Sequence, residues 1–212
     1  MVISAFEHRA GKNNMSANQF KAALGEAELE YTWLDSPDDA KYLFFKQFKE
    51  NEGKGRTFET RKVILLAILL TKGSAKDKSE YLFDLFDEDA NLELSQKEIT
   101  DCLTALFDIA RDQLVDLGVG QPLGAEGTLE APKVEAYKTK LERNKESAIK
   151  KTVVGIAGTS NKISKEGFAA KMATAEYKQL VTSAGIRMMV AGESAAVSDP
   201  SANPPADQQN QD

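Results

Sequence analysis

Oxygen-bearing residues recur at nearly every second position in one short stretch of the chain. They are Asp87, Asp89, Asn91, Glu93, Ser95 and Glu98. Ca²⁺ is a hard cation that takes about six to eight oxygen ligands, and this spacing lets a short loop wrap them around one ion. Glu93 would contribute its backbone carbonyl, and Glu98 is long enough to bind through both carboxylate oxygens. The stretch therefore predicts a Ca²⁺ site, with Mg²⁺ as an alternative occupant at rest.

One residue of this stretch is unfavourable for the turn. Leu92 stands sixth in this stretch, which resembles an EF-hand loop. Such loops carry glycine at that position, because the chain turns there with a left-handed backbone that glycine adopts easily. A bulky L-residue in that conformation costs about 1–2 kcal/mol, and about 1.4 kcal/mol corresponds to tenfold in affinity. We therefore expect Ca²⁺ to bind roughly tenfold more weakly than to a glycine-containing loop, with a Kd on the order of 10⁻⁵ M or above.

Helices are predicted on both sides of the loop, and they must hold it in position. Apolar side chains recur at helical spacing before it and after it. They are Leu82, Phe83, Leu85 and Phe86, then Ile99, Cys102, Leu103 and Leu106. Ser95 followed three residues later by Glu98 forms a capping box, so the second helix should begin there. We interpret Cys102 as a small core residue rather than a redox or nucleophilic group.

An apolar residue followed by serine begins three similar segments of the chain, at 15–20, 94–99 and 163–168. It suggests further loops at 8–19 and 156–167, and Phe58 can anchor another at 51–62. None has a ligand set for calcium. The 51–62 loop has Lys62 where a closing glutamate belongs, and a cation there repels a metal ion. The other two loops have no carboxylate at a ligand position, so we predict that all three lack metal.

Taken together, these loops resemble the EF-hand superfamily. The order of one ligand-rich loop and three ligand-poor loops is similar to four-EF-hand sensors of the recoverin, neuronal calcium sensor and calcineurin B type. The resemblance is strongest over residues 40–107 and weaker elsewhere between about 5 and 175. It implies an all-α fold of two EF-hand pairs, with the short loop strands pairing within each pair. It also implies a protein target, an amphipathic helix bound in an apolar groove.

Domain boundaries follow from this resemblance and from composition. We expect an N-terminal pair at 1–74 with both loops degenerate, and a C-terminal pair at 75–175 that contains the 87–98 loop. A stretch rich in Gly and Pro at 118–132 should be an inserted loop. A C-terminal helix is expected at 176–190. The tail at 191–212 is rich in Ala, Ser, Pro and Asp, and we expect it to be disordered.

Composition restricts the partners. The 212-residue chain has a net charge of -6, which argues against nonspecific binding to nucleic acid or acidic membranes. Its longest apolar run, 63–70, is too short for membrane insertion. Val2 stands where an N-myristoylation motif requires glycine. With one cysteine and no signal-peptide pattern, we expect a cytoplasmic protein, with the cytoskeleton or a cilium as further locations.

The helix expected around 63–70 is apolar on nearly every face, so something must cover it. Two covers remain open, a partner helix and the C-terminal segment of the same chain. The apolar residues of that segment are Tyr177, Leu180, Val181, Ile186, Met188, Met189 and Val190.

We find no pattern of an enzyme, because there is no glycine-rich phosphate loop, no paired nucleophile and base, and no zinc spacing. Two functions remain. The first is a calcium-binding regulatory protein with one Ca²⁺ per chain. The second is a constitutive structural or adaptor subunit of a cytoskeletal or ciliary assembly, in which calcium binding is vestigial.

Overall fold

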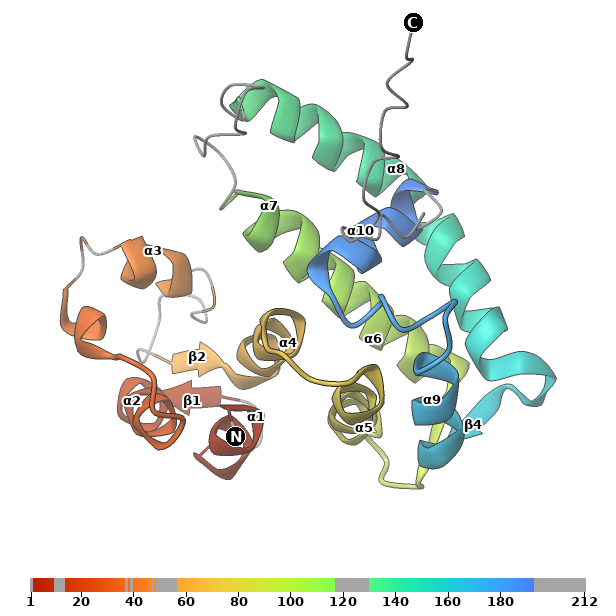
Figure 1. Cartoon of the computed structure of the whole chain (residues 1–212), viewed down its shortest axis with the longest axis horizontal. Coiled ribbons are helices and arrows are strands. Elements are labelled where there is room, and N and C mark those ends of the chain that lie inside the picture. The colour runs from red at the N-terminus through yellow and green to blue at the C-terminus, as the bar shows by residue number, and fades with distance from the viewer. Residues whose placement is uncertain are drawn as a thin grey trace, which may run out of the picture.

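The computed structural model in Figure 1 is mostly helical, with two short antiparallel sheets. This confirms the prediction of a helical fold with short strands. The structure describes residues 2–9, 14–36, 38, 40–46, 48, 57–116 and 130–192. The predicted loops 8–19 and 51–62 therefore lie partly outside the described residues. Most of the predicted inserted loop 118–132 and nearly all of the predicted tail 191–212 also lie outside them.

The first half of the chain surrounds one two-stranded sheet. Its elements are α1 (Val2–Arg9), β1 (Asn14–Ser16), α2 (Ala17–Glu26), α3 (Ala40–Lys46), β2 (Thr57–Glu59) and α4 (Thr60–Leu70). Strands β1 and β2 run antiparallel, with Met15 opposite Phe58. Both of these side chains are buried, and the Phe58 ring stacks on Phe20 at 4.4 Å between centroids.

The second half surrounds the other sheet. Its elements are α5 (Ala75–Phe86), β3 (Glu93–Ser95), α6 (Gln96–Asp108), a π-helical turn (Ile109–Gln113), α7 (Leu114–Asp116), α8 (Ala131–Ala157), β4 (Lys162–Ser164), α9 (Lys165–Met172) and α10 (Ser183–Ala191). Strands β3 and β4 are antiparallel, with Leu94 opposite Ile163. In Figure 1, α6 and α7 form one long rod, and α8 runs back beside it.

Two helices begin with the capping boxes that the sequence predicts. The Ser16 side chain accepts a hydrogen bond from the Gln19 backbone N–H, and the Gln19 side chain accepts one from the Ser16 N–H. Ser95 and Glu98 make the same reciprocal pair at the start of α6. Each box satisfies two backbone donors that the first helical turn leaves without intrahelical partners.

Helix α4 is covered from within the chain. Its buried residues are Thr60, Val63, Ile64, Leu65, Leu66, Ile68 and Leu69, while Leu70 at its end is exposed. The elements packed against α4 include α1, α6 and the π-helical turn Ile109–Gln113. Ile3 and Phe6 supply the apolar face of α1. Most of the apolar surface of α4 is therefore buried without a partner helix.

The C-terminal segment mainly covers other elements. Helix α10 packs on α8, α6 and the π-helical turn, as Figure 1 shows. The helix is also shorter than the predicted 176–190, because turns occupy the chain before it and the Thr182 side chain caps it by accepting from the Gly185 N–H. The buried Lys78 ammonium on α5 donates to the Val181 carbonyl at 3.3 Å. Burial lowers the pKa of Lys78.

Cys102 lies in the core, as predicted, with about 1% of its surface exposed. Burial raises the pKa of its thiol. Among the described helices, none is both long enough and apolar enough to cross a bilayer.

Candidate metal centre

The predicted ligands lie in the loop that joins α5 to β3 and α6. The Asp87 N–H donates to the Phe83 carbonyl and closes α5, and Ser95 caps α6. Between them the backbone becomes left-handed at Ala90, with φ 54°, and at Leu92, with φ 64°. The loop is thus fixed at both ends by helix caps and turns sharply in its middle.

Three carboxylates of this loop converge. Oxygen atoms of Asp87, Asp89 and Glu98 all lie within 4.8 Å of one another. In the ranges that the structure describes, no other group of three acidic, histidine or cysteine side chains converges in this way. Asp87 and Glu98 are half-buried and Asp89 is exposed, so the cluster opens to solvent on one side.

Backbone N–H groups hold Asp87 and Asn91, among other predicted ligands, in the loop. Asp87 accepts hydrogen bonds from the N–H groups of Asn91, at 3.1 Å, and Leu92, at 3.0 Å. The Asn91 side-chain oxygen accepts from the Glu93 N–H at 2.7 Å. These donors offset part of the repulsion between the clustered carboxylates and keep them in one arrangement.

The Glu98 carboxylate accepts hydrogen bonds both from the start of α6 and from the start of the loop. Its Oε2 accepts from the Ser95 backbone N–H at 2.8 Å and from the Ser95 hydroxyl at 2.7 Å. Its Oε1 accepts from the Glu88 N–H at 3.3 Å. The carboxylate that caps α6 therefore also closes the loop against its first residues, so the start of the helix and the acidic cluster are linked through one side chain.

The side chains of Asn91 and Glu93 make further contacts. Asn91 donates from its amide to Asp89 Oδ2 at 2.8 Å. The Glu93 side chain forms an ion pair with Lys162 on β4 at 3.3 Å. Its carboxylate is thus directed to the neighbouring strand, which is compatible with the prediction that Glu93 contributes a backbone carbonyl.

Leu92 has the left-handed backbone that its position in the loop predicts, with φ 64°. Its side chain is 72% exposed, so little burial offsets the conformational strain. The cost is that of a single L-residue in this region, about 1–2 kcal/mol.

Cations surround the loop. On α4, Arg61 donates to the Glu88 carboxylate at 3.0 Å and lies over the Phe86 ring at 5.0 Å from its centroid. On α6, a hydrogen bond from Lys97 to Asp101 raises the pKa of Lys97, and the charges of Glu88 and Glu98 act in the same direction. Local sequence patterns could not reveal the contact between Arg61 and Glu88, because it joins positions that are far apart in the chain.

The predicted loop 156–167 lies beside the acidic loop. Asn161 has φ 59°, and its backbone carbonyl accepts from the Gln96 N–H at 3.1 Å. The Gln96 side-chain amide also donates to the Asn161 side-chain oxygen at 2.8 Å. Asparagine tolerates this backbone region better than most residues, which is the sequence signal for the turn. The contact with Gln96 had no such signal.

The donor set of the acidic loop fits a hard divalent cation. It consists of carboxylate, amide and hydroxyl oxygens, without the nitrogen or sulfur ligands that zinc and copper prefer. In comparisons with known proteins, no family model, curated protein or solved structure matches the chain.

Proposed function

We propose that this protein is a calcium-responsive regulator of the EF-hand type, which binds one Ca²⁺ in the 87–98 loop. The observation that carries the proposal is the convergence of Asp87, Asp89 and Glu98 within 4.8 Å. Asn91, the Glu93 carbonyl and Ser95 would complete the oxygen set. A bound divalent cation would neutralise the carboxylates, and Mg²⁺ would be the competing ion at rest.

The arrangement of helices and strands supports the EF-hand interpretation. Helices α5 and α6 flank the acidic loop, and α8 and α9 flank the loop 156–167. The strands of these two loops pair at Leu94 and Ile163. Strands β1 and β2 give the first half a corresponding pair. In this proposal the four units form two EF-hand pairs, and three of the loops serve as scaffold.

The link between loop and helix gives a route for regulation. Glu98 caps α6 through Ser95 and also contacts the N–H of Glu88. A carboxylate has about four acceptor sites, and Glu98 already accepts three hydrogen bonds, so binding a metal through both oxygens would displace at least one of them. We propose that calcium thereby changes the start of α6 and, through it, the surface that a target helix contacts.

A constitutive adaptor is the second candidate, and two observations favour it. Leu92 places strain in the acidic loop, and the loop 156–167 keeps its turn and its strand without carboxylate ligands. A helical scaffold of a cytoskeletal or ciliary assembly would need the loops only for their shape. The cytoplasmic location expected from composition suits both candidates.

Calorimetric titration of the full chain with Ca²⁺ separates the two. We expect one binding event, with a Kd on the order of 10⁻⁵ M, and a shift in amide hydrogen exchange at the start of α6. Glu98→Gln should weaken binding by more than about tenfold, because it removes the closing charge. Glu93→Gln is the matched control, since it removes a charge in the same loop but keeps the backbone carbonyl. Absence of binding up to millimolar Ca²⁺ would support the adaptor.

A further inference from the structure

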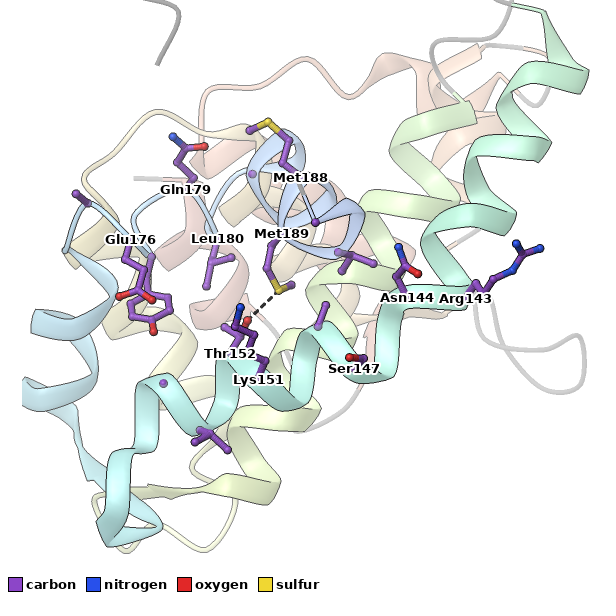
Figure 2. A pocket seen from close by; sticks show the side chains of 18 residues that line it. Arg143, Asn144, Ser147, Lys151, Thr152, Glu176, Gln179, Leu180, Met188 and Met189 are labelled. Atoms are coloured by element: carbon purple, nitrogen blue, oxygen red, sulfur yellow. Dashed lines mark hydrogen bonds between the residues drawn. The ribbon is translucent and has the colours of Figure 1, made fainter. Parts of the chain in front are cut away.

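A pocket of about 790 Å³ lies between α8 and the chain from Ala175 to Gly192. Figure 2 shows it with α8 along one side and the C-terminal segment along the other. Its volume falls within the range of roughly 300–1,000 Å³ that is usual for ligand sites. It is remote in sequence from the acidic loop and has no part in the proposed metal chemistry.

The wall that α8 contributes is polar and basic. Arg143, Asn144, Ser147 and Lys151 line it at a spacing that places them along one side of the helix. Arg143 and Lys151 are exposed. Within the described part of the chain, neither makes an ion pair or a side-chain hydrogen bond, unlike Lys145 on the same helix, which pairs with Asp108. Two cations are thus available at the pocket.

The opposite wall is apolar over much of its length. Leu180, Met188 and Met189 line it from the C-terminal segment, with Glu176 and Gln179 as polar residues of the same segment. Val154 adds an exposed apolar side chain to the α8 wall. Figure 2 shows Met189 pointing toward Thr152, whose hydroxyl donates to the Met189 sulfur at 3.0 Å. Methionine side chains adapt to irregular apolar partners, so this wall suits the apolar face of a helix.

The charges along the pocket are not symmetric. Arg143 lies at one end in Figure 2, and Glu176 lies at the other. Burial and a hydrogen bond to the Glu176 carboxylate raise the pKa of Tyr177 to about 12. An anionic occupant is therefore attracted along α8 by Lys151 and Arg143 and repelled at the Glu176 end, which fixes its direction.

The separation of the two cations indicates what kind of anion fits. Arg143 and Lys151 are eight positions apart on one helix, which corresponds to about 12 Å along its axis. A single carboxylate, as in a fatty acid, can reach only one of them. Two carboxylates about two helical turns apart can reach both, while the apolar residues between them contact Leu180, Met188 and Met189.

From this geometry we infer that the pocket docks an acidic amphipathic helix of a partner protein, through two carboxylates about two turns apart. The inference takes from the proposed function only the idea that the partner is a helix. It adds the location of the docking site, the charge of the partner and its direction, and it does not require an ion in the acidic loop.

The test uses two synthetic helical peptides and the full chain in excess chelator, so that it can fail or succeed separately from calcium binding. One peptide carries glutamates about two turns apart around a leucine face, and the other carries lysines at the same positions. Fluorescence anisotropy should show the glutamate peptide binding about tenfold more tightly. Equal affinity for both peptides would overturn the proposal.

Charge reversal of the protein provides the second arm. The double variant Arg143→Glu, Lys151→Glu should lose about tenfold in affinity for the glutamate peptide and gain affinity for the lysine peptide. Both positions are exposed, so the fold should be retained, which circular dichroism checks. Lys76→Glu is the matched control, because Lys76 is an exposed lysine on α5 that does not line the pocket. An equal loss in that variant would contradict a site at α8.

Two further outcomes would assign the pocket to another occupant. Displacement of the glutamate peptide by a single-headed fatty acid at equal concentration would favour a lipid. Peptide binding that appears only after deletion of residues 193–212 would assign the pocket to the tail of the chain itself, which leaves from Gly192 at the pocket wall. Either result would overturn the proposal.

Discussion

The two neighbouring loops of the second half share a backbone shape from their sixth position onward but differ in chemistry. Both turn through a left-handed residue at their sixth position, with φ 64° at Leu92 and φ 59° at Asn161. Both place an apolar residue in the sheet two positions later and a serine cap after it. Only 87–98 has carboxylates at the ligand positions. The turn, the strand and the helix cap therefore do not depend on acidic residues.

The loops also differ in how well their residues suit that shape. Asparagine is favoured in the left-handed region, and leucine is not. The loop with the metal-binding chemistry thus has the more strained turn, and the loop without it has the relaxed one. Shape and ligand affinity are separate properties of such a loop, and substitutions can alter one without the other.

Substitutions in the sheet should give the largest difference between the loops. Leu94 is fully buried, and Ile163 is only half-buried. Leu94→Ala should therefore cost about 2–5 kcal/mol of unfolding free energy, and Ile163→Ala less than about 2 kcal/mol. Urea denaturation of the two variants measures this difference. Equal losses of unfolding free energy would mean that the two strand residues contribute equally to the core.

The closing residues give the next largest effect. Glu98→Gln should weaken Ca²⁺ binding by about 2 kcal/mol, while Gly167→Gln at the same position of the other loop should leave it almost unchanged. Calorimetry in the same buffer compares them. A comparable loss in both variants would show that the affinity comes from the paired loops as a unit rather than from the acidic loop.

Glycine substitution at the sixth position should have a larger effect in the acidic loop than in the loop 156–167. Leu92→Gly removes the strain and should tighten Ca²⁺ binding by about tenfold, or roughly 1.4 kcal/mol. Asn161→Gly has less strain to remove and should change unfolding free energy by less than about 1 kcal/mol. Calcium titration of the first variant and thermal unfolding of the second test this. Unchanged or weaker calcium binding by Leu92→Gly would refute the strain argument.

The helix caps should give the smallest difference. Ser95→Ala breaks a full capping box and should cost about 1 kcal/mol, measured in chelator so that loss of a metal ligand does not contribute. Ser164 accepts only the single bond from the Gly167 N–H at 3.2 Å. Ser164→Ala should therefore cost less, about 0.5 kcal/mol. If Ser164→Ala lowered thermal stability more than Ser95→Ala, the second hydrogen bond of the Ser95 hydroxyl, which it donates to Glu98 Oε2, would not contribute to stability.

Local features of this fold could be predicted from the sequence, because neighbouring residues determine them. The capping boxes at Ser16 and Ser95 and the apolar strand residues Leu94 and Ile163 follow from spacing and residue type. The left-handed turn at Leu92 follows from the resemblance to an EF-hand loop. The identity of the ion and the grouping into two domains stay predictions.

Features that join distant parts of the chain could not be predicted in this way. Periodicity shows that α10 has an apolar face but not which helix it contacts, so the sequence alone could not show that α8 and α6 are its neighbours. The π-helical turn Ile109–Gln113 also has no local sequence signal. The pocket could not be predicted from periodicity either, because its walls are formed by residues about forty positions apart.

The position of Cys102 has a practical consequence. It is the single cysteine of the chain and lies within the core, with its thiol kept protonated by burial. Because the thiolate is the form that reacts, an alkylating reagent should label this protein only when α6 separates from its neighbours. The rate of labelling, followed by mass spectrometry, would then report how often the native structure opens, without any engineered probe.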